Sequence, residues 1–533
     1  MSRITCESLL DMQNRLVVDE LMFDRLSLEE EHKRLMNFLT DEQRVVYDKI
    51  ISADRAGKGG LFFLYGFGGT KKTFIWNTVS ASVRSKVDIV LNVTPSGIAS
   101  LLLPGGRTTH PRFRIPIKIN EDSTCNIKLN STIAELLSKT KLIIWDEAPM
   151  VHKFCFEALD RTLRDVLRFS DPRCVDMPFG GKVVVLGGDF RQILPVIPHG
   201  SRQEIVHTTI NSSNLWSHCH LLTLAKNMRL NSGSSTHNLK EIKEFFEWLL
   251  KDGDGDLGDD VDRESIIIIP DELLIRESKD PISDMVNFVY PNLLDNILDQ
   301  TFFKERAILT PKLSDVAMLN EHLMSMIPGE EMTFLSSDKI LKQDVTSSVK
   351  DDEFTPKILN TLSCSGIPDH KLTLKVKVPV KLLRNIDQSR DLCNGTRLLI
   401  TKLGNHVVEV IVLTGSNIGE PVLIPIMTMS LSCHTFPINF QRRQFPLIVS
   451  FAMTINKSQG QSLSHASIYL PKPVFTHGQL YVARSRVKNK HGLKILILDE
   501  NGNIVVWYRI RISSTIGILF TAIFAQTVFH GNQ

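Results

Sequence analysis

The segment LFFLYGFGGTKKTFIW, residues 61–76, constrains the fold more than any other part of the chain. It reads as an apolar strand, a glycine-rich loop and the start of a helix. It carries every fixed position of the phosphate-binding pattern G-x-x-x-x-G-K-[ST] except one, because Lys71 stands where the second glycine belongs. Backbone N–H groups in such loops bind phosphates at a helix N-terminus, where the helix dipole favours anions. The segment therefore predicts an α/β domain that binds a nucleotide.

The loop residues predict distinct roles in holding a triphosphate. The ammonium of Lys72 would neutralise charge on the β- and γ-phosphates, and the hydroxyl of Thr73 would bind Mg²⁺. The predicted ATP-binding residues of the loop are Gly66, Gly68, Gly69, Thr70, Lys72 and Thr73. A plain glycine loop before a helix is the alternative, but it rarely has an apolar strand ahead of it and Lys-Thr behind it.

Two further strand ends carry side chains that suit nucleotide hydrolysis. In KLIIWDEAPM an apolar run ends in Asp146, which would hold the metal, and Glu147, which would orient and deprotonate the attacking water. In VVVLGGDFRQILPV the amide of Gln192 would sense the γ-phosphate without competing for its charge. Strand ends of this kind gather at the ligand-binding edge of an open α/β sheet.

Two arginines are candidates for the charge that develops on the transferred phosphate. Arg229 lies in LAKNMRL after the first α/β unit, and Arg486 lies in GQLYVARSRV in a second one. A guanidinium can bridge the spread negative charge of such a transition state. We therefore expect Arg229 and Arg486 to act with Glu147 and Gln192 in catalysis.

The order of the apolar runs predicts the architecture. Short runs at 61–65, 88–93, 141–145 and 182–188 read as buried strands of a parallel sheet with helices on both faces. An acidic segment, 252–265, reads as a solvated linker, because Leu257 and Arg263 do not fit a calcium loop. A second strand–helix pattern begins near residue 306. Short β runs between about 360 and 435 predict a small antiparallel barrel inserted in it.

Charge, cysteines and termini narrow the functional classes. A net charge of +3 makes any nucleic-acid site a local basic groove. Eight scattered cysteines argue against zinc modules and a disulfide framework. The N-terminus resembles neither a secretory signal nor a transit peptide. The uncharged stretch 512–529 fits a membrane tail anchor or a poorly packed extension; we favour the second and expect no stable membrane association.

Together these motifs resemble a known family. From about residue 39 to 503 the chain is similar to the PIF-type (petite integration frequency) ATP-dependent DNA helicases, in the version carried by Helitron-like transposons. The segments that carry the resemblance, in family order, are GFGGTKKT, TPSGIASLLLPGGRTTHPRF, IIWDEAPM, VLGGDFRQILPV, LAKNMRL, LCNGTRL, FAMTINKSQGQSL and GQLYVARSRV. Each alone is weak, but the set is highly specific.

The resemblance implies two RecA-like P-loop domains with an SH3-like barrel inserted in the second. The predicted parts are an N-terminal helical extension (1–38), the first motor domain (39–232), a helical and acidic connector (233–300), the second motor domain (301–358 and 436–503), the inserted barrel (359–435) and an apolar tail (504–533). Gln43 would read adenine. The implied DNA contacts are Thr94, Ser96, Gly97, Thr109, His110, Thr454, Asn456, Lys457, Ser458 and Gln459.

The resemblance also implies the activity: Mg²⁺ and ATP would drive 5′→3′ movement on single-stranded DNA and unwinding of duplexes, forks or G-rich structures. We expect a monomer on DNA, a nuclear location (with a mitochondrial one as the alternative), and roles in DNA repair, recombination and telomere maintenance. A motor that steps on any sequence should hold phosphates and stack on bases rather than read base edges.

Some residues depart from the family pattern. Lys71 is the main departure, because the backbone approaches the phosphates closely there, and a side chain either projects away at a cost of about 1–3 kcal/mol or blocks the site. Arg484 stands where the family usually has an apolar residue. Three readings therefore stay open: an active motor, a degenerate transposon-derived copy that binds single-stranded DNA and hydrolyses ATP weakly or not at all, and an ATPase that acts on something other than DNA.

Overall fold

The computed structural model describes most of the chain. The described residues are 14–197, 200–228, 236–254, 260–261, 264–276, 278–297, 299–340, 355–362, 366–432, 439–472, 474 and 478–510. The chain folds into two compact units. Unit 1 comprises Met1–Ile268, Pro473–Ser485 and Trp507–Gln533, and unit 2 comprises Ile269–Lys472 and Arg486–Val506.

Unit 1 is built on a six-stranded parallel sheet in the order β3-β2-β4-β5-β1-β6. Its strands are β1 (Gly60–Gly66), β2 (Ile89–Thr94), β3 (Arg107–Thr108), β4 (Thr140–Trp145), β5 (Val183–Gly188) and β6 (Cys219–Leu224). All the strands run the same way, so their carboxyl ends meet at one edge. The four strands predicted from apolar runs are confirmed; β3 and β6 lack such a run, and sequence reasoning did not find them.

Apolar side chains fill both faces of this sheet because successive residues of a strand point to opposite sides. On β1, Leu61, Phe63 and Tyr65 join one buried cluster, and Phe62 and Leu64 join another on the opposite face. The helices of unit 1 that precede or cover the sheet are α2 (Arg15–Leu21), α3 (Arg25–Met36), α4 (Asp41–Ala56), α5 (Lys72–Arg84), α6 (Gly97–Ser100), α7 (Thr109–Phe113), α8 (Thr132–Lys139), α9 (Lys153–Leu167) and α10 (Arg202–His207).

The first helices are tied to the rest of unit 1 by a buried carboxylate. Glu20 on α2 forms ion pairs with Arg112 on α7 at 2.5 Å and with Arg84 at the end of α5 at 3.5 Å. All three side chains are at most 10% exposed. Because a buried charge must be paired, this contact fixes α2 against the elements that follow β1 and β3.

Unit 2 has its own parallel sheet, in the order β20-β9-β21-β22. The strands are β9 (Arg306–Thr310), β20 (Ala452–Thr454), β21 (His465–Leu470) and β22 (Leu493–Ile497), and the helices are α12 (Pro281–Val289), α13 (Gln300–Lys304) and α14 (Leu313–Met326). On α14 the buried amide of Asn320 accepts from Ala452 N at 2.8 Å and donates to Val449 O at 3.0 Å. This polar contact holds α14 on the sheet.

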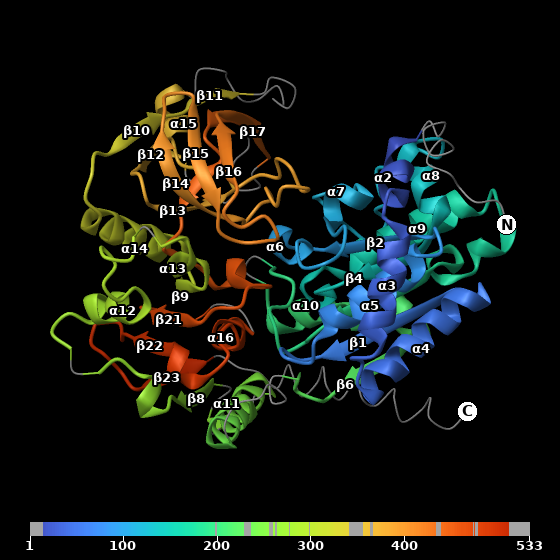
Figure 1. The fold of residues 1–533 in the computed structure, drawn as a ribbon, viewed down its shortest axis with the longest axis horizontal. Helices are drawn as coiled ribbons and strands as arrows, with labels where there is room; N and C mark the ends of the chain where they lie inside the picture. Colours follow the sequence, from blue (N-terminus) through green and yellow to red (C-terminus); the bar gives the residue numbers. More distant parts are fainter. Residues whose placement is uncertain are drawn as a thin grey trace. The chain divides into compact units, whose positions relative to one another are not determined.

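An antiparallel region is inserted in unit 2, as expected from the sequence. Its five-stranded sheet has the order β16-β15-β14-β13-β19, and smaller sheets β11-β18-β17 and β10-β12 accompany it (Figure 1, orange and yellow). The strands are β10 (Met332–Leu335), β11 (Ser337–Ile340), β12 (Lys371–Leu374), β13 (Pro379–Leu382), β14 (Arg397–Leu403), β15 (Val407–Val412), β16 (Pro421–Pro425), β17 (Met427–Ser432), β18 (Asn439–Gln444) and β19 (Leu447–Val449), with α15 (Pro356–Thr361) beside them.

These antiparallel strands extend beyond the predicted barrel range, 359–435, on both sides. The apolar run 446–454, expected to be one strand, is two: β19 pairs with β13 in the antiparallel sheet, and β20 pairs with β9 in the parallel sheet. The chain changes sheets at Ser450, whose N–H donates to Pro379 O at 2.9 Å. The exact domain boundaries therefore stay predictions.

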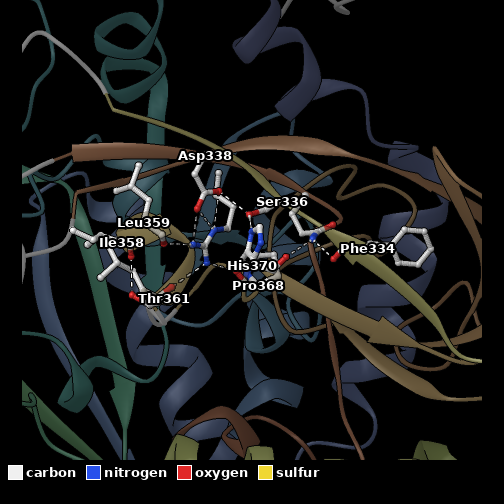
Figure 2. A network of polar contacts seen from close by, with 11 residues as sticks. Phe334, Ser336, Asp338, Ile358, Leu359, Thr361, Pro368 and His370 are labelled. Carbon is white, nitrogen blue, oxygen red and sulfur yellow. Dashed lines mark hydrogen bonds and ion pairs between the residues drawn. The ribbon is translucent and has the colours of Figure 1, made fainter. Parts of the chain in front are cut away.

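A buried ion pair anchors the three-stranded sheet of this region. Arg442 on β18 and Asp338 on β11 are both fully buried, and the guanidinium meets both carboxylate oxygens at 2.7–3.1 Å. The remaining N–H groups of Arg442 donate to the carbonyls of Leu359, Leu362 and Pro368. Figure 2 shows Asp338, Leu359 and Pro368 in this polar network. All five guanidinium donors are satisfied, which is what a buried arginine requires.

The prediction that the acidic segment 252–265 is a solvated linker is partly wrong. Helix α11 (Thr236–Asp254) continues into it, and Asp252 is buried. Its carboxylate pairs with Arg484 of α16 (Gln479–Arg484) at 2.9 Å, and the guanidinium of Arg484 lies 4.8 Å from the ring centroid of Trp248. Figure 1 shows α16 (red) beside α11 (green), and both belong to unit 1. The acidic, glycine-rich composition predicted exposure to solvent. Distant arginines supply the counter-charges instead: Arg484 pairs with Asp252, and Arg191 pairs with Asp254.

The strands β7 (Asp260–Val261), β8 (Glu264–Ile268) and β23 (Trp507–Ile510) form a separate antiparallel sheet in unit 1. The apolar stretch 512–529 lies outside the described residues. Among the helices within the described ranges, none has the length and apolar character needed to cross a membrane.

Candidate active site

The phosphate loop connects β1 to α5, as the pattern predicted. The ammonium of Lys72, the first residue of α5, is buried and donates to the carbonyl of Gly66. The hydroxyl of Thr70 donates to Phe67 O at 3.0 Å and closes the turn. A Cβ on Gly66 would lie 2.7 Å from this hydroxyl, so glycine is required there. The loop thus turns tightly onto the N-terminus of a helix, the geometry that binds phosphate.

Lys71 does not block the loop. Its backbone has φ 58° and ψ 44°, in the left-handed region that the missing glycine would adopt without strain. Its side chain is exposed to solvent. The lysine therefore keeps the loop conformation and pays in backbone strain, which matches the first of the two outcomes expected from the sequence.

Asp146 follows β4 at the same edge; the residue is half-buried, and its Oδ1 is buried. Burial raises the pKa of Asp146, and the nearby Lys72 charge acts in the opposite direction. Oδ1 makes no hydrogen bond of normal geometry to a described residue. A Cβ on Gly187 would lie 2.8 Å from Oδ1 and 2.5 Å from the Trp76 ring, so only glycine fits next to it. A buried, unsatisfied carboxylate oxygen fits a divalent cation such as Mg²⁺.

Glu147, directly after Asp146, has a left-handed backbone with φ 55°. A glutamate rarely takes this conformation, and such outliers cluster at functional sites because the surrounding structure must hold them. The conformation turns the chain sharply at the strand end, into a short 3₁₀ turn, Ala148–Met150. This is consistent with the predicted role of Glu147 as the base for water.

Gln192 follows β5, the strand between β1 and β4. Its side chain is buried, and its N–H donates to Asp189 O at 3.0 Å. The phosphate loop, the Asp146–Glu147 pair and Gln192 therefore follow three adjacent strands of one sheet. The sheet topology brings these predicted residues to a common edge.

A buried network that the sequence reasoning missed surrounds Gln192. Arg191 donates to the hydroxyl of Tyr65 on β1 and pairs with Asp254 of α11 at 2.7 Å. Asp189 accepts from the Tyr481 hydroxyl of α16 at 2.9 Å. The only sequence signal for this network was that Arg191 directly precedes the predicted site residue Gln192. The partners of Arg191, Tyr65 and Asp254, lie far from it in the sequence. The network ties the ends of β1 and β5 to α11 and α16.

Gln43 is buried and is part of the capping box of α4. Its amide oxygen accepts from Thr40 N at 3.2 Å, and its amide nitrogen donates to Thr70 O at 3.1 Å. It therefore fixes the phosphate loop to α4, and its adenine-reading role stays a prediction. Arg229 lies outside the described residues; Met228, just before it, donates from N to Gly69 O at 3.0 Å.

The predicted DNA contacts of unit 1 lie at the carboxyl ends of β2 and β3. Thr94 ends β2 and is paired in register with Thr108 of β3. The side chains of Thr94 and Thr109 are fully buried, and that of His110 is exposed. Ser96 and Gly97 begin α6. The topology brings all five residues to the edge that carries the phosphate loop, and their contacts with DNA stay predictions.

The predicted DNA contacts of unit 2 lie after β20. Thr454 ends this strand, and Asn456, Lys457 and Ser458 form a 3₁₀ turn, Ile455–Ser458, that leads into the buried Gln459. Arg486 is 9% exposed, and its guanidinium donates to the carbonyls of Ser458 at 3.5 Å and Gln461 at 3.2 Å. The predicted catalytic arginine is thus bonded to the backbone of the predicted DNA-contacting segment.

Comparison with known proteins gives the family context. Residues 38–263 match the family model of the PIF1-like helicases, and residues 357–403 match that of the 2B domain of DNA helicase Pif1, together about half of the chain. The ATP-dependent DNA helicase PIF1 of Xenopus laevis is 26% identical over 86% of this chain, and the chain spans 62% of that protein's length. The corresponding Pif1 of Campylobacter jejuni is 24% identical, and the match covers 87% of this chain and 96% of that one.

Solved structures agree on the fold. A Pif1 helicase studied for unwinding at forked double-stranded DNA aligns over 92% of this chain and 98% of its own, with a TM-score of 0.62 and 21% identity. A Bacteroides Pif1 bound to single-stranded DNA aligns over 89% of this chain and all of its own, with a TM-score of 0.58 and 22% identity. These likenesses confirm the predicted fold class: α/β, with RecA-like parallel sheets and an antiparallel insertion.

Proposed function

The chain belongs to the PIF1-like helicases, and from this membership we propose that it hydrolyses ATP to move 5′→3′ along single-stranded DNA and unwind duplexes. The chain spans less than two thirds of the length of several PIF1 relatives, so membership of the family does not by itself establish the activity.

One observation carries the proposal: three loops suited to a nucleoside triphosphate follow the adjacent strands β1, β5 and β4. The first loop supplies the buried Lys72, the second supplies Gln192, and the third supplies Asp146 with its buried Oδ1. Ligands bind at the carboxyl edge of such sheets. The charge of Lys72 lowers the pKa of Asp146 against the effect of burial, as expected of a cation and a carboxylate that serve one nucleotide site.

Each residue has a role in this reaction. The Thr73 hydroxyl and the Asp146 carboxylate would hold Mg²⁺, which supplies positive charge to the phosphates. Lys72 and the loop N–H groups bind the β- and γ-phosphates. Glu147 orients the attacking water and accepts its proton, and Gln192 senses the γ-phosphate. Guanidinium groups of Arg229 and Arg486 stabilise the charge that develops in the transition state.

The nucleic-acid partner we propose is single-stranded DNA, including the single strands of forks and G-rich structures. The turn that holds Asn456, Lys457 and Ser458 is small and polar, which suits contact with phosphates and sugars of any sequence. We propose that the protein acts as a monomer on DNA in the nucleus, in repair, recombination and telomere maintenance.

The decisive experiment measures ATP hydrolysis with and without single-stranded DNA, and displacement of a strand from duplexes with a 5′ or a 3′ tail. We expect DNA to stimulate hydrolysis and only the 5′-tailed duplex to be unwound. Glu147→Gln should keep nucleotide binding and lose hydrolysis, since it removes the base but not the phosphate contacts. A fluorescent fusion protein tests the nuclear location.

Absence of DNA-stimulated hydrolysis in the unmodified chain would contradict the motor and favour a DNA-binding copy without ATPase activity. Hydrolysis that ignores DNA, with no binding to single strands, would instead favour an ATPase acting on another substrate. The exposed side chain of Lys71 speaks against a blocked site.

A further inference from the structure

Lys381 is a buried lysine in unit 2 without a counter-charge. It lies in the middle of β13, with 8% of its surface exposed. Its ammonium makes no hydrogen bond or ion pair with any residue in the described ranges. A buried ammonium is costly unless it is paired, so this position calls for an explanation.

The residue opposite Lys381 is also a cation. In the antiparallel pairing of β13 with β14, Lys381 faces Arg397, and residues directly opposite each other share a face of the sheet. Arg397 is fully buried, and its guanidinium donates to Arg306 O at 2.8 Å and Ser450 O at 2.9 Å. Both acceptors are neutral carbonyls. Like charges placed opposite each other destabilise a sheet, so the pair costs stability in the free protein.

A third cation, Lys457, acts electrostatically on Lys381. Burial, with smaller contributions from the charges of Lys457 and Arg397, lowers the pKa of Lys381 to about 7, and no described carboxylate acts against them. Lys457 is exposed in the 3₁₀ turn after β20. Of Lys381, Arg397 and Lys457 only Lys457 is exposed, so we expect an anion to approach the three cations from its side.

We propose that Lys381, together with Lys457, binds a backbone phosphate of single-stranded DNA. The inference rests on the proposed function and extends it, because none of the DNA contacts expected from the sequence includes Lys381. A phosphodiester supplies the missing negative charge. It is also the part of DNA that a sequence-independent motor must hold.

The chemistry of the cluster favours a strand phosphate over a protein carboxylate. Lys457 belongs to the segment TINKSQG, which carries the implied strand contacts, so an anion at Lys381 would be continuous with that segment. Lysine acts as a point charge that tolerates any orientation of the phosphate, and this suits a strand that slides past.

The test measures binding of an oligothymidine by fluorescence anisotropy across a salt series. For Lys381→Met we expect about tenfold weaker binding at low salt and a slope of log K against log salt that is shallower by about 0.7, the share of one phosphate contact. The matched control is Lys402→Met, which removes an exposed lysine from the neighbouring strand β14 and should leave both quantities unchanged. Thermal unfolding of each variant confirms that it folds.

A second measurement locates the contact. A neutral methylphosphonate is walked through the oligothymidine one linkage at a time, and one position should weaken binding to the unmodified protein but not to Lys381→Met. The inference is overturned if Lys381→Met leaves the affinity and the salt slope unchanged. It is also overturned if the loss from the variant and the loss from the methylphosphonate add in full at every linkage. Either result leaves the helicase proposal intact. If Lys381→Met loses affinity for inorganic phosphate but not for the oligonucleotide, the site serves a free anion and the inference is wrong. No binding of DNA by the unmodified protein would reject both.

Discussion

At the scale of single residues, the strained backbone of the nucleotide edge carries the clearest consequences. Lys71 and Glu147 both adopt left-handed conformations, with φ 58° and 55°, at the ends of the phosphate loop and of β4. For a residue with a Cβ this costs about 1–2 kcal/mol. The strain at Glu147 accompanies a predicted catalytic role, whereas at Lys71 it follows from a missing glycine.

The first prediction concerns Lys71→Gly. Glycine adopts φ near 60° freely, so the variant should unfold at a higher temperature, by the equivalent of about 1 kcal/mol in the folded state. The loop should also bind phosphate better, so we expect a lower KM for ATP, within about tenfold. Thermal unfolding and steady-state ATPase assays measure the two effects.

Lys71→Ala separates strain from charge. It removes the ammonium but keeps the Cβ, so it should show neither the rise in unfolding temperature nor the fall in KM. If alanine improves the enzyme as much as glycine does, charge rather than backbone strain is the defect at this position.

The second prediction concerns the pH dependence of stability at Lys381. Its pKa is about 7 in the folded chain against an ordinary value of 10.5. The unfolded state therefore binds more protons between pH 7 and 10.5, and stability from this group rises with pH across that window. Lys381→Met removes the penalty, so its midpoint of urea unfolding should exceed that of the unmodified protein at pH 7, by the equivalent of a few kcal/mol.

The advantage of Lys381→Met should shrink as the pH is raised toward 10. There the side chain of residue 381 is neutral in the folded state of both proteins. Lys182, whose pKa burial lowers to about 8, is present in both proteins and cancels from the difference. A difference in midpoint that is constant with pH would mean that Lys381 is not the titrating group.

At the scale of elements, α16 shows a departure from the family pattern and its compensation. Arg484 is fully buried against Trp248 and pairs with Asp252, which is 5% exposed. Burial raises the pKa of Asp252, and Arg484 acts to lower it, so each charge depends on the other. A single helix is thereby attached to the end of α11 within unit 1.

The third prediction is a double-mutant cycle on this pair. Arg484→Leu and Asp252→Leu should each lower the unfolding temperature, by the equivalent of about 3–5 kcal/mol, because each leaves a buried charge unpaired. The combined variant should recover most of the loss. As the control, Arg173→Leu breaks an exposed pair with Asp171 and should leave the unfolding temperature nearly unchanged. Purely additive losses in the double variant would contradict the coupling.

The elements also show what a sequence can predict. The strands β1, β4, β5 and β9 follow from continuous apolar runs, and the loop after β1 follows from its glycines, because these signals are local. The burial of Asp252 depends on Arg484, more than 200 residues away, and the two-residue strand β3 has no apolar run at all. The break between β19 and β20 arises because neighbouring residues pair with two different sheets, which no local pattern records.

At the scale of the whole molecule, the predicted site residues are divided between the two units. The phosphate loop, Asp146, Glu147 and Gln192 belong to unit 1, whereas Arg486 and the turn with Lys457 belong to unit 2. The parallel α/β character of both sheets could be expected from the sequence, and so could the common edge of unit 1, but the strand orders could not. The backbone contacts of Arg486 could not, because they depend on how two loops of unit 2 meet.

The fourth prediction concerns how Arg486 joins DNA binding to hydrolysis. Its guanidinium donates to the carbonyl of Ser458, a predicted DNA contact, and to that of Gln461, and lysine keeps the charge but cannot span both acceptors or bridge phosphate oxygens. Arg486→Lys should therefore lower DNA-stimulated turnover at least about a thousandfold, the value of an arginine at a phosphoryl transition state. Nucleotide affinity should change little, because the phosphate loop lies in unit 1.

Three measurements test this coupling together: DNA-stimulated turnover, binding of a fluorescent nucleotide, and anisotropy of an oligothymidine. Arg443→Lys, an exposed arginine on β18, is the control and should match the unmodified protein in all three. Turnover near normal in Arg486→Lys would exclude a transition-state role. A loss of turnover with equal loss of nucleotide binding would place Arg486 in ground-state binding instead. Only loss of turnover with both affinities kept fits an arginine that acts when the nucleotide and the strand are bound.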